Sequence, residues 1–381
     1  MKKVTAVALA VLSLALYALP QFNRPTLPAF GVHQPHAVAN EQPFFAEDYL
    51  SSEAPNQRSH VASICELSDG RLAAVWYSGT HEVAPDVVIN LTTRPPGENA
   101  AWSAPRAIVS RDSASKELYR YIKTVGNPVI FADATDRLWL VYVTITLGGW
   151  SGSSLNVKTS DDGGTTWSDS RRLTLSPFLN VSELVRNNPL PLEGGGVVVP
   201  IYHEFMGKFP ELLWLSAADS PGDLSWHKTR IAGGRSYIQP TVVPFDNQTA
   251  VAFLRDCSKN RMVTSVNTLD AGQHWSAPTA TDLPNPNAAV DALQLSDGRL
   301  LIVFNDTRRG RDNLKLAVSS DKGATWKRIA TLEDTPKELF AYPYMIRTRD
   351  GNIHLVYSWC MKRIKHVVFN EAWLKSKEAA Q

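Results

Sequence analysis

The chain has 381 residues, of which 44% are hydrophobic and 20% are charged, so it can bury a sizeable core and is not a disordered chain. Its formal net charge is only +2 and it has no long run of Lys or Arg, which argues against a nucleic-acid partner. The three cysteines, Cys65, Cys257 and Cys360, are too few and too widely spaced for a disulfide framework or a cysteine-built zinc site. We therefore expect no metal and no cofactor.

The first twenty residues have the chemistry of a targeting segment. Lys2 and Lys3 precede an apolar run over 4–19, and Pro20 ends it. Residues 1–20 are a signal peptide or an uncleaved N-terminal anchor, because the run is short for a membrane span and no A-x-A cleavage signal follows it. Both interpretations predict export to the periplasm or the extracellular space, with membrane contact only through 4–19. Residues 21–42 are rich in Pro, Ala, Gln and Asn and indicate a linker.

From residue 43 onward, one pattern recurs six times. It is an apolar stretch, a polar turn that is often Asp-Gly, and a second apolar stretch, which together predict a β-hairpin. The six copies begin, in chain order, at His60, Asn127, Asn188, Gln239, Ala289 and Tyr342. A third short strand follows each copy, at 86–93, 154–160, 211–217, 261–268, 313–320 and 364–370. No amphipathic helix of convincing length lies between them.

Hairpins repeated about every 50–65 residues, each with a third and often a fourth strand, are typical of propeller blades. One blade cannot bury both of its faces, whereas six blades around an axis bury them against one another. We therefore predict an all-β fold over 43–381, a six-bladed β-propeller of four-stranded antiparallel blades. Residues 43–50 are expected to supply the missing fourth strand of the last blade. A pair of β-sandwiches would explain the regular period less well.

A second repeat follows the third strand of several copies. It is S-D-D-G-G-T-T-W over 160–167 and S-S-D-K-G-A-T-W over 319–326, with a weaker copy over 268–275. In such a turn the Asp carboxylate can accept backbone N–H groups, the Gly supplies a positive φ, and the Trp packs between blades. We expect a structural role for Asp162 and Asp321. A calcium or sugar site at these carboxylates is the other interpretation.

With these Asp boxes on six hairpin repeats, the sequence resembles the sialidase superfamily over about residues 43–374, and especially the bacterial neuraminidase-like proteins with BNR repeats. The resemblance implies a secreted, monomeric glycosidase with a carbohydrate bound at the centre of the propeller, and Asp boxes on the outer rim. In sialidases three Arg hold the substrate carboxylate. A Tyr assisted by a Glu is the nucleophile, and a separate acid protonates the leaving oxygen.

The catalytic positions of the family are matched in part. Tyr342 stands eight residues before an Asp-Gly turn, which is the register of the nucleophile. The position of the assisting Glu holds Ala289, and the nearest carboxylate is Asp291, two residues on and on the same face of the strand. The loop after the second strand of the first copy offers Glu82 and Asp86 as the acid/base.

The arginine positions are largely unmatched. The first holds His60, although Arg58 lies two residues earlier on the same strand face. The second holds Asn305, with Arg308, Arg309 and Arg311 nearby in the sequence, and the third has no match. The resemblance therefore implies an enzyme that differs from an ordinary arginine-triad sialidase.

Further candidates for substrate binding are polar residues that recur at equivalent places in the repeats, because a ring of such groups suits the hydroxyls of a sugar. They lie at the starts of the copies and at the ends of the second strands of the third and fourth copies: Asn127, Gln239, Asn287, Tyr202, His203, Glu204 and Arg255.

Three functions remain open at this point. The first is an exo-glycosidase that acts on an acidic glycan. The second is a carbohydrate-binding propeller without catalysis. The third is a polysaccharide lyase on the same scaffold, with His60 or His203 as its base. Free sugar, saturable binding without turnover, or an unsaturated uronate would distinguish them.

Overall fold

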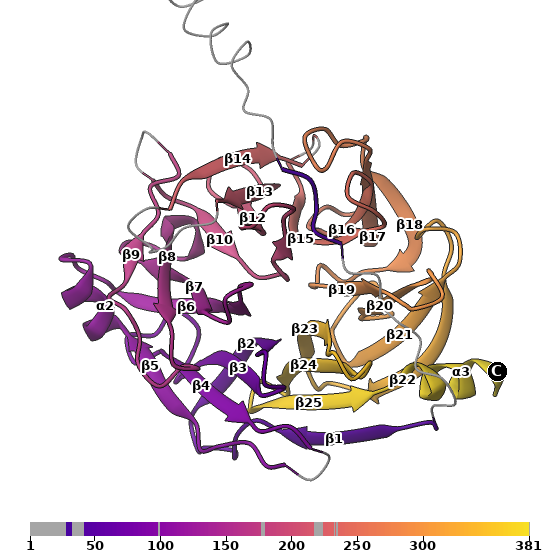
Figure 1. Cartoon of the computed structure of the whole chain (residues 1–381), viewed down its shortest axis with the longest axis horizontal. Helices are drawn as coiled ribbons and strands as arrows, with labels where there is room; N and C mark the ends of the chain where they lie inside the picture. The colour runs from indigo at the N-terminus through magenta and orange to yellow at the C-terminus, as the bar shows by residue number, and fades with distance from the viewer. Residues whose placement is uncertain are drawn as a thin grey trace, which may run out of the picture.

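The computed structural model describes residues 28–32, 42–97, 100–176, 180–216, 224–231, 233 and 235–380. They form a six-bladed β-propeller, as the hairpin repeats predict (Figure 1). The strands of each blade run outward from the axis in chain order, except that β1 is the outermost strand of blade 6. Blade 1 contains β2 (Arg58–Glu66), β3 (Leu72–Gly79), β4 (Val88–Arg94) and β5 (Arg106–Ser110), and blade 2 contains β6 (Thr124–Ala132), β7 (Leu138–Ile145), β8 (Ser153–Ser160) and β9 (Arg171–Arg172). Blade 3 contains β10 (Glu183–Val185) with β11 (Leu190–Pro191), β12 (Val197–His203), β13 (Phe209–Leu215) and β14 (Trp226–Arg230), and blade 4 contains β15 (Tyr237–Pro244), β16 (Ala250–Asp256), β17 (Met262–Thr268) and β18 (Thr279–Pro284). Blade 5 contains β19 (Asp291–Gln294), β20 (Leu300–Phe304), β21 (Asn313–Ser319) and β22 (Lys327–Asp334), and blade 6 contains β23 (Phe340–Arg347), β24 (Ile353–Trp359), β25 (Arg363–Phe369) and β1 (Phe45–Tyr49).

Helical structure among the described residues is confined to three short segments outside the blades. They are α2 (Arg111–Glu117), the 3₁₀ turn η1 (Trp150–Gly152) and α3 (Glu371–Ala379). In the part of the chain that the structure describes, no helix is long and apolar enough to cross a bilayer. The predicted targeting segment 1–20 lies outside the described residues.

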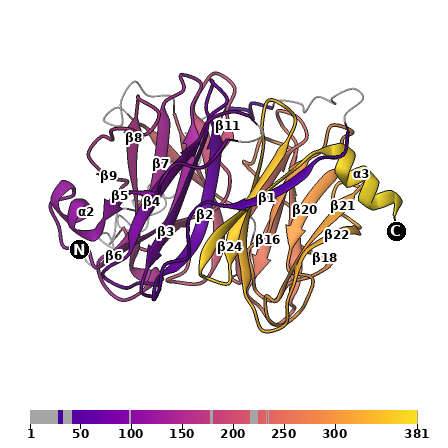
Figure 2. The same cartoon turned by 90° about the horizontal axis from the view of Figure 1, so that it is seen from below.

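The ring closes where β1 pairs antiparallel with β25, which confirms the predicted fourth strand of the last blade. The side chain of Asn370 accepts a hydrogen bond from the backbone N–H of Phe44 and so fixes the start of this strand. Asp48 of β1 then accepts from His366 in blade 6 and forms an ion pair with Arg94 in blade 1. The closing strand therefore joins the last blade to the first (Figures 1 and 2).

The core is a set of apolar layers between adjacent blades, and strand alternation creates it. In β7, Leu138, Leu140 and Tyr142 pack toward blade 1, whereas Val141 and Val143 pack toward blade 3. Because both faces of each sheet are covered, the middle strands are almost uninterrupted runs of apolar residues, as expected for strands that are buried on both faces. Each fully buried aliphatic side chain contributes about 1.5–3 kcal/mol to stability.

The Asp boxes form self-contained turns between the third and fourth strands. The carboxylate of Asp162 accepts from the backbone N–H of Thr166 at 2.9 Å, and the indole of Trp167 donates to the carbonyl of Gly164 at 3.1 Å. Gly164 has a φ of +92°, which a side chain would strain. Both oxygens of this carboxylate are engaged by its own turn. The geometry is that of a structural turn.

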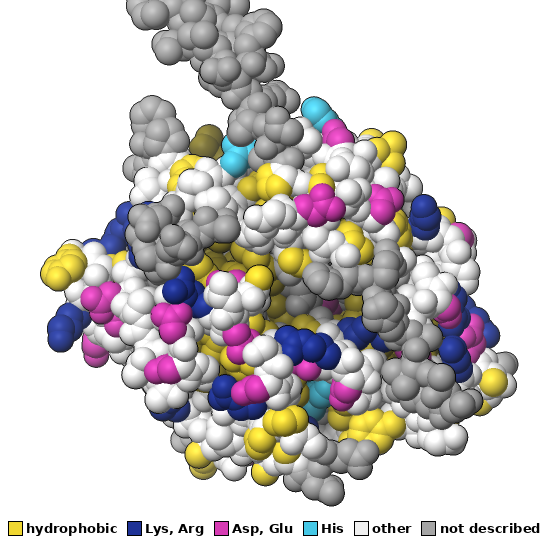
Figure 3. Space-filling model, in the orientation of Figure 1, with side chains coloured by type: hydrophobic (Ala, Val, Ile, Leu, Met, Phe, Trp, Pro, Cys, Tyr) yellow, Lys and Arg dark blue, Asp and Glu magenta, His cyan; other side chains and the backbone are white. Residues whose placement is uncertain are grey.

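One described part of the predicted linker packs on the propeller. Phe30 is fully buried, stacks on Trp214 with ring centroids 6.2 Å apart, and donates its backbone N–H to the carbonyl of Asn247. It thus lies against the hairpin turns of blades 3 and 4, and Figure 1 shows this short indigo segment crossing that face. Figure 3 presents the same face, which is hollowed near its centre with hydrophobic side chains visible inside.

Candidate active site

A repeated irregularity in the innermost strands shapes the site. In blades 1, 2, 4 and 6 the pairing register with the second strand shifts near the start of the strand. One residue in each irregularity has a positive φ of 43–56°: Val61, Asn127, Gln239 and Tyr342. A β-bulge re-aims side chains, and a non-glycine residue in this conformation costs about 1–3 kcal/mol. In four blades the starting end of the innermost strand therefore carries backbone strain.

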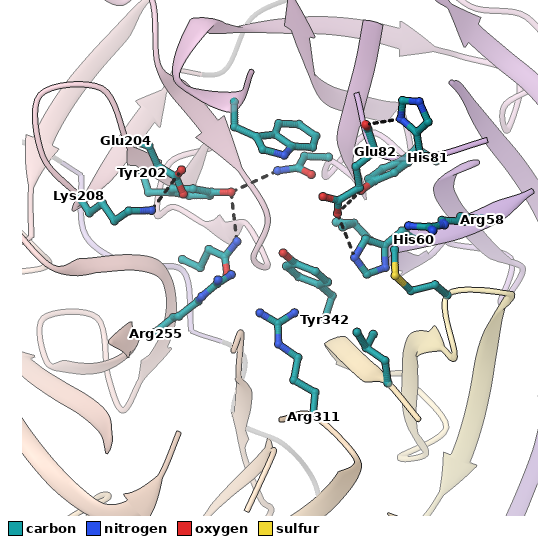
Figure 4. A pocket seen from close by; sticks show the side chains of 17 residues that line it. Arg58, His60, His81, Glu82, Tyr202, Glu204, Lys208, Arg255, Arg311 and Tyr342 are labelled. Carbon is teal, nitrogen blue, oxygen red and sulfur yellow. Dashed lines mark hydrogen bonds and ion pairs between the residues drawn. The ribbon is translucent and has the colours of Figure 1, made fainter. Parts of the chain in front are cut away.

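These ends border a cavity of about 620 Å³ on the axis, at the face opposite the hairpin turns (Figure 4). Nine of the fifteen residues predicted for the site line it: Tyr342, Glu82, His60, Arg58, Asn127, Tyr202, Glu204, Gln239 and Arg255.

Tyr342 of β23 lies at the centre of this cavity (Figure 4). Its ring contacts that of His60 edge-on, with centroids 4.8 Å apart. The guanidinium groups of Arg255 and Arg311 interact electrostatically with Tyr342, and that of Arg311 lies 5.6 Å from the centre of its ring. A third guanidinium, that of Arg186, lies 5.7 Å from the centre of the ring and is fully buried. Three cations therefore surround one phenol.

Asn287 fixes the two arginines that interact with Tyr342. Its side-chain oxygen accepts from Arg255 Nε at 2.7 Å, and its backbone carbonyl accepts from Arg311 Nη2 at 2.8 Å. Gln239 accepts a further hydrogen bond from Arg255 at 3.1 Å. These partners are all neutral, so the positive charges are oriented without being neutralised.

The basic side chains that line the cavity differ in whether they have an acidic partner. Lys208 forms an ion pair with Glu204 at 3.3 Å. Within the described part of the chain, by contrast, no ion pair is formed by the three lining arginines, which are Arg58, Arg255 and Arg311. The described carboxylate that acts on Arg311 is Glu82, which interacts with it through space and not as a direct ion pair.

The opposite wall carries a carboxylate. Glu82 accepts from the Tyr77 hydroxyl at 3.1 Å and lies 3.3 Å from His60 Nε2. The hydrogen bond with His60 lowers the pKa of Glu82, and burial lowers the pKa of His60. At neutral pH the resting site therefore holds an ionised Glu82 beside a neutral imidazole.

A neutral hydrogen-bond network forms the third wall. The hydroxyl of Tyr202 accepts from Asn127 Nδ2 at 3.2 Å and from Gln239 Nε2 at 3.1 Å. Burial raises the pKa of Tyr202, so it stays a neutral phenol. The amides and this phenol offer the kind of partners that sugar hydroxyls require.

Asp291 does not reach the cavity. It is fully buried and accepts from Thr241 Oγ1 at 2.6 Å, from the Met345 N–H at 2.6 Å and from Asn188 Nδ2 at 3.0 Å. These donors belong to blades 4, 6 and 3, so the carboxylate joins four blades beneath the site. Burial raises its pKa, while the nearby charge of Arg186 lowers it.

Five other predicted residues also lie outside the lining. Asp86 accepts from the backbone and side chain of Thr80 in its own loop. His203 stacks on Phe209, with ring centroids 4.6 Å apart, on the strand face opposite Tyr202. The remaining three are Asn287 behind the arginines, Asn305 bonded to the carbonyls of residues 313 and 340, and Arg308 next to the sulfur of residue 262.

Several residues of the site were not predicted as site residues, among them Tyr77 beside Glu82. Arg311 is one of the three arginines near Asn305 in the sequence, but Arg308 was chosen from that cluster. Lys208 stands four residues after Glu204. Trp150 of η1 and the buried Arg186 had no sequence signal that distinguishes them from core residues. Among the described residues, no group of three or more His, Cys, Asp or Glu is placed to hold a metal.

The family is identified by comparison. A model for the BNR repeat-like domain matches residues 70–355, which is most of the propeller. The structure is similar to the Hadza microbial sialidase Hz136 (16% identity, TM-score 0.66, 82% of this chain and 65% of that one). It is also similar to a protein of unknown function from Dyadobacter fermentans (14% identity, TM-score 0.69, 86% of this chain and 99% of that one). A third similar structure is the intramolecular trans-sialidase from Ruminococcus gnavus (15% identity, TM-score 0.65, 83% of this chain and 95% of that one). No curated protein matches the sequence. Identities this low establish the fold alone, whereas the domain match shows that the chain belongs to the BNR repeat-like domain family.

Proposed function

We propose that the chain is a glycan-active enzyme that removes a terminal acidic sugar in the central cavity. The observation that carries this proposal is the pair of guanidinium groups, Arg255 and Arg311, that converge on Tyr342 without an anionic partner among the described residues. Buried or half-buried cations are ordinarily paired, so an unpaired set favours a ligand that brings the negative charge. A carboxylate on the sugar is that charge.

The size and lining of the cavity support an exo-acting enzyme. About 620 Å³ is the range of a small-ligand site, and the buried layer around Asp291 closes it below. Asn127, Gln239 and Tyr202 offer hydrogen bonds to hydroxyl groups, while Arg255, Arg311 and Arg58 offer charge. These features support a terminal residue bound end-on.

For hydrolysis, Tyr342 is the proposed nucleophile. No described carboxylate is bonded to its hydroxyl, so we infer that the phenol proton passes to water as the oxygen bonds to the anomeric carbon, and that the arginines stabilise the negative charge which this oxygen carries before the bond is complete. Glu82 is the proposed proton donor to the leaving oxygen and the proton acceptor when water releases the glycosyl group. Because its pKa is lowered in the resting site, this mechanism predicts activity that is highest under acidic conditions.

A polysaccharide lyase is the second candidate, and the ionised state of Glu82 favours it. An ionised Glu82 beside a neutral His60 is prepared to accept a proton rather than to donate one at neutral pH. Arginines that neutralise a uronate carboxylate would make the neighbouring C–H more acidic, and the neutral His60 would remove that proton. The glycosidic oxygen on the next carbon would then leave with a proton from the Tyr342 hydroxyl as the double bond forms. His203 is a poor base for this reaction because it lies outside the cavity lining.

One screen tests these proposals. The mature chain is incubated with glycans that end in sialic or uronic acids, from pH 4 to pH 8, and the products are separated. Free acidic sugar supports the glycosidase, and an ultraviolet-absorbing unsaturated uronate supports the lyase. Saturable binding without any product contradicts both and favours a binding propeller. The apolar run at 4–19 is the basis for proposing that the enzyme acts outside the cytoplasm.

A further inference from the structure

The innermost strand of blade 3 is interrupted between β10 and β11. β10 ends at Val185 and β11 begins at Leu190, so Arg186, Asn187 and Asn188 leave the sheet between them. These three residues are the axial segment. Arg186 and Asn187 are fully buried, so the axial segment lies in the interior of the ring.

The axial segment is bonded to two blades that do not adjoin blade 3. Arg186 Nη2 donates to the carbonyl of Pro343 in blade 6, which lies opposite blade 3 in the ring of six (Figure 1). Asn187 Nδ2 donates at 3.3 Å to the carbonyl of Val290, just before the first strand of blade 5. Asn188 Nδ2 donates to a backbone carbonyl of blade 6 at 2.9 Å and to a carboxylate of blade 5 at 3.0 Å. The axial segment therefore crosses the middle of the propeller.

The hydrogen bond from Arg186 reaches blade 6 at the bulge that carries Tyr342. Pairing in β23 is interrupted between Ala341 and Tyr344, and Tyr342 has a φ of +56°. A side chain in this conformation costs free energy and persists only where the surrounding contacts impose it. Arg186 supplies such a contact, because it holds the carbonyl of Pro343, the residue that follows Tyr342.

A neutral side chain has the same role at the corresponding bulge of blade 2. There Asn127 has the positive φ, and the carbonyl of Pro128 accepts from Ser63 Oγ of blade 1 at 3.1 Å. A hydroxyl is therefore enough to hold such a bulge. Burying a charged guanidinium costs far more free energy than burying a hydroxyl, so the hydrogen bond alone does not account for an arginine at the bulge of blade 6.

The charge of Arg186 lies next to the phenol. Its guanidinium carbon lies over the ring of Tyr342, 5.7 Å from the ring centre, and over that of Tyr344 at 5.6 Å. Its Nε and Nη1 have no hydrogen-bond partner among the described residues, and Asp291 acts on it through space and not as a direct ion pair. A cation over an aromatic face is attracted to the ring, and more strongly where water is excluded. This attraction increases when the phenol oxygen gains negative charge.

We propose that Arg186 is a positioning residue for the nucleophile: from the opposite blade it holds Tyr342 in its strained conformation and keeps a positive charge over the phenol ring during attack. Arg186 is fully buried and does not line the cavity, so it acts through Tyr342 and does not touch the sugar. Its loss is therefore expected to slow turnover without weakening binding. The inference rests on the proposed function, because it takes Tyr342 as the nucleophile.

The test measures kcat for Arg186 variants of the full chain, with the acidic glycan that gives the most product in the screen. Arg186→Gln keeps a donor for the carbonyl of Pro343 but removes the charge, and it is expected to lower kcat about 10–100-fold. Arg186→Lys keeps the charge and is expected to remain within about threefold of the wild-type kcat. Affinity is measured by calorimetric titration with Tyr342→Phe added to prevent turnover, and Arg186→Gln is expected to change it less than threefold.

Two controls separate this role from a structural one. Asn187→Ala removes the bond from the axial segment to Val290, lies outside the cavity lining, and is expected to keep kcat within threefold of the wild type. Arg186→Gln also leaves the buried Asp291 without a balancing cation, so folding is followed by urea unfolding. If Arg186→Gln does not fold, the double variant Arg186→Gln/Asp291→Asn removes both charges, and its kcat is compared with that of Asp291→Asn alone.

The outcomes separate the inference from the proposed function. Wild-type kcat in folded Arg186→Gln, a loss that Arg186→Lys shares, or an equal loss in Asn187→Ala overturns the inference, while product release by the wild type still supports the proposed function. A loss of affinity as large as the loss of kcat also overturns the inference, because Arg186 would then act on binding. A wild type that releases no product overturns the proposed function and the inference with it.

Discussion

The role of Asp291 gives the sharpest test of which carboxylates are structural. Asp291→Asn keeps the shape of the side chain but removes the charge that balances the buried Arg186. The amide NH₂ would also face either the Met345 N–H and Asn188 Nδ2 or the Thr241 hydroxyl, where a carboxylate now accepts. Breaking a buried charge pair costs about 3–5 kcal/mol. We expect the free energy of unfolding to fall by that amount, with a lower melting temperature.

The assay is urea unfolding followed by tryptophan fluorescence, with Asp297→Asn as the control. Asp297 lies in an exposed hairpin turn of the same blade and, among the residues that the structure describes, forms an ion pair only with Arg299, so its loss is expected to cost less than about 1 kcal/mol. Turnover by folded Asp291→Asn is expected to remain measurable. An Asp291→Asn variant that keeps full stability but loses all turnover would refute the structural assignment and make Asp291 the base for Tyr342.

Three further predictions concern packing, pH and charge. Gly323→Ala is expected to lower the free energy of unfolding by about 1–3 kcal/mol more than Gly298→Ala does. Both glycines have a positive φ, but only at Gly323 would an added Cβ clash with Phe253. Equal losses of stability in urea titration would contradict this prediction. Burial lowers the pKa of His354 to about 3, so stability is expected to fall as pH drops from about 6.5 toward 3, and less so in His354→Gln; identical pH profiles would count against it. Arg311→Met is expected to weaken binding of an acidic glycoside about 10–100-fold and binding of its methyl ester less than threefold. Equal losses of affinity for the acid and the ester would show that Arg311 does not recognise the negative charge of the ligand.

Features that depend on local sequence were predicted well. The Asp boxes encode their own turns, since the Asp, the Gly and the Trp all act within a few residues of one another. The closing strand followed from counting strands per blade, and the Phe45–Tyr49 pairing confirms it. The Asp-box turns need no knowledge of how distant segments meet, and the closing strand needs only the number of strands in each blade.

Side-chain placement at the axis was harder to predict because it depends on contacts between blades. Asn305 stands at an arginine position, but its amide holds two backbone carbonyls, and Arg311 approaches Tyr342 from the loop instead. Asp291 lies on the correct strand, yet donors from three other blades hold it below the cavity. Strand alternation alone, by contrast, is enough to place Tyr202 and His203 on opposite faces.

The most direct test of the proposed function measures turnover and binding together for the wild type and Tyr342→Phe, with the acidic glycan that gives the most product in the screen. The wild type is expected to release product, and Tyr342→Phe to be at least ~100-fold slower while its binding affinity stays within about threefold. Tyr344→Phe is a matched control, because this neighbouring tyrosine is buried below the cavity rather than lining it. Turnover by Tyr342→Phe at the wild-type rate, or saturable binding by the wild type with no product, would contradict the proposed function.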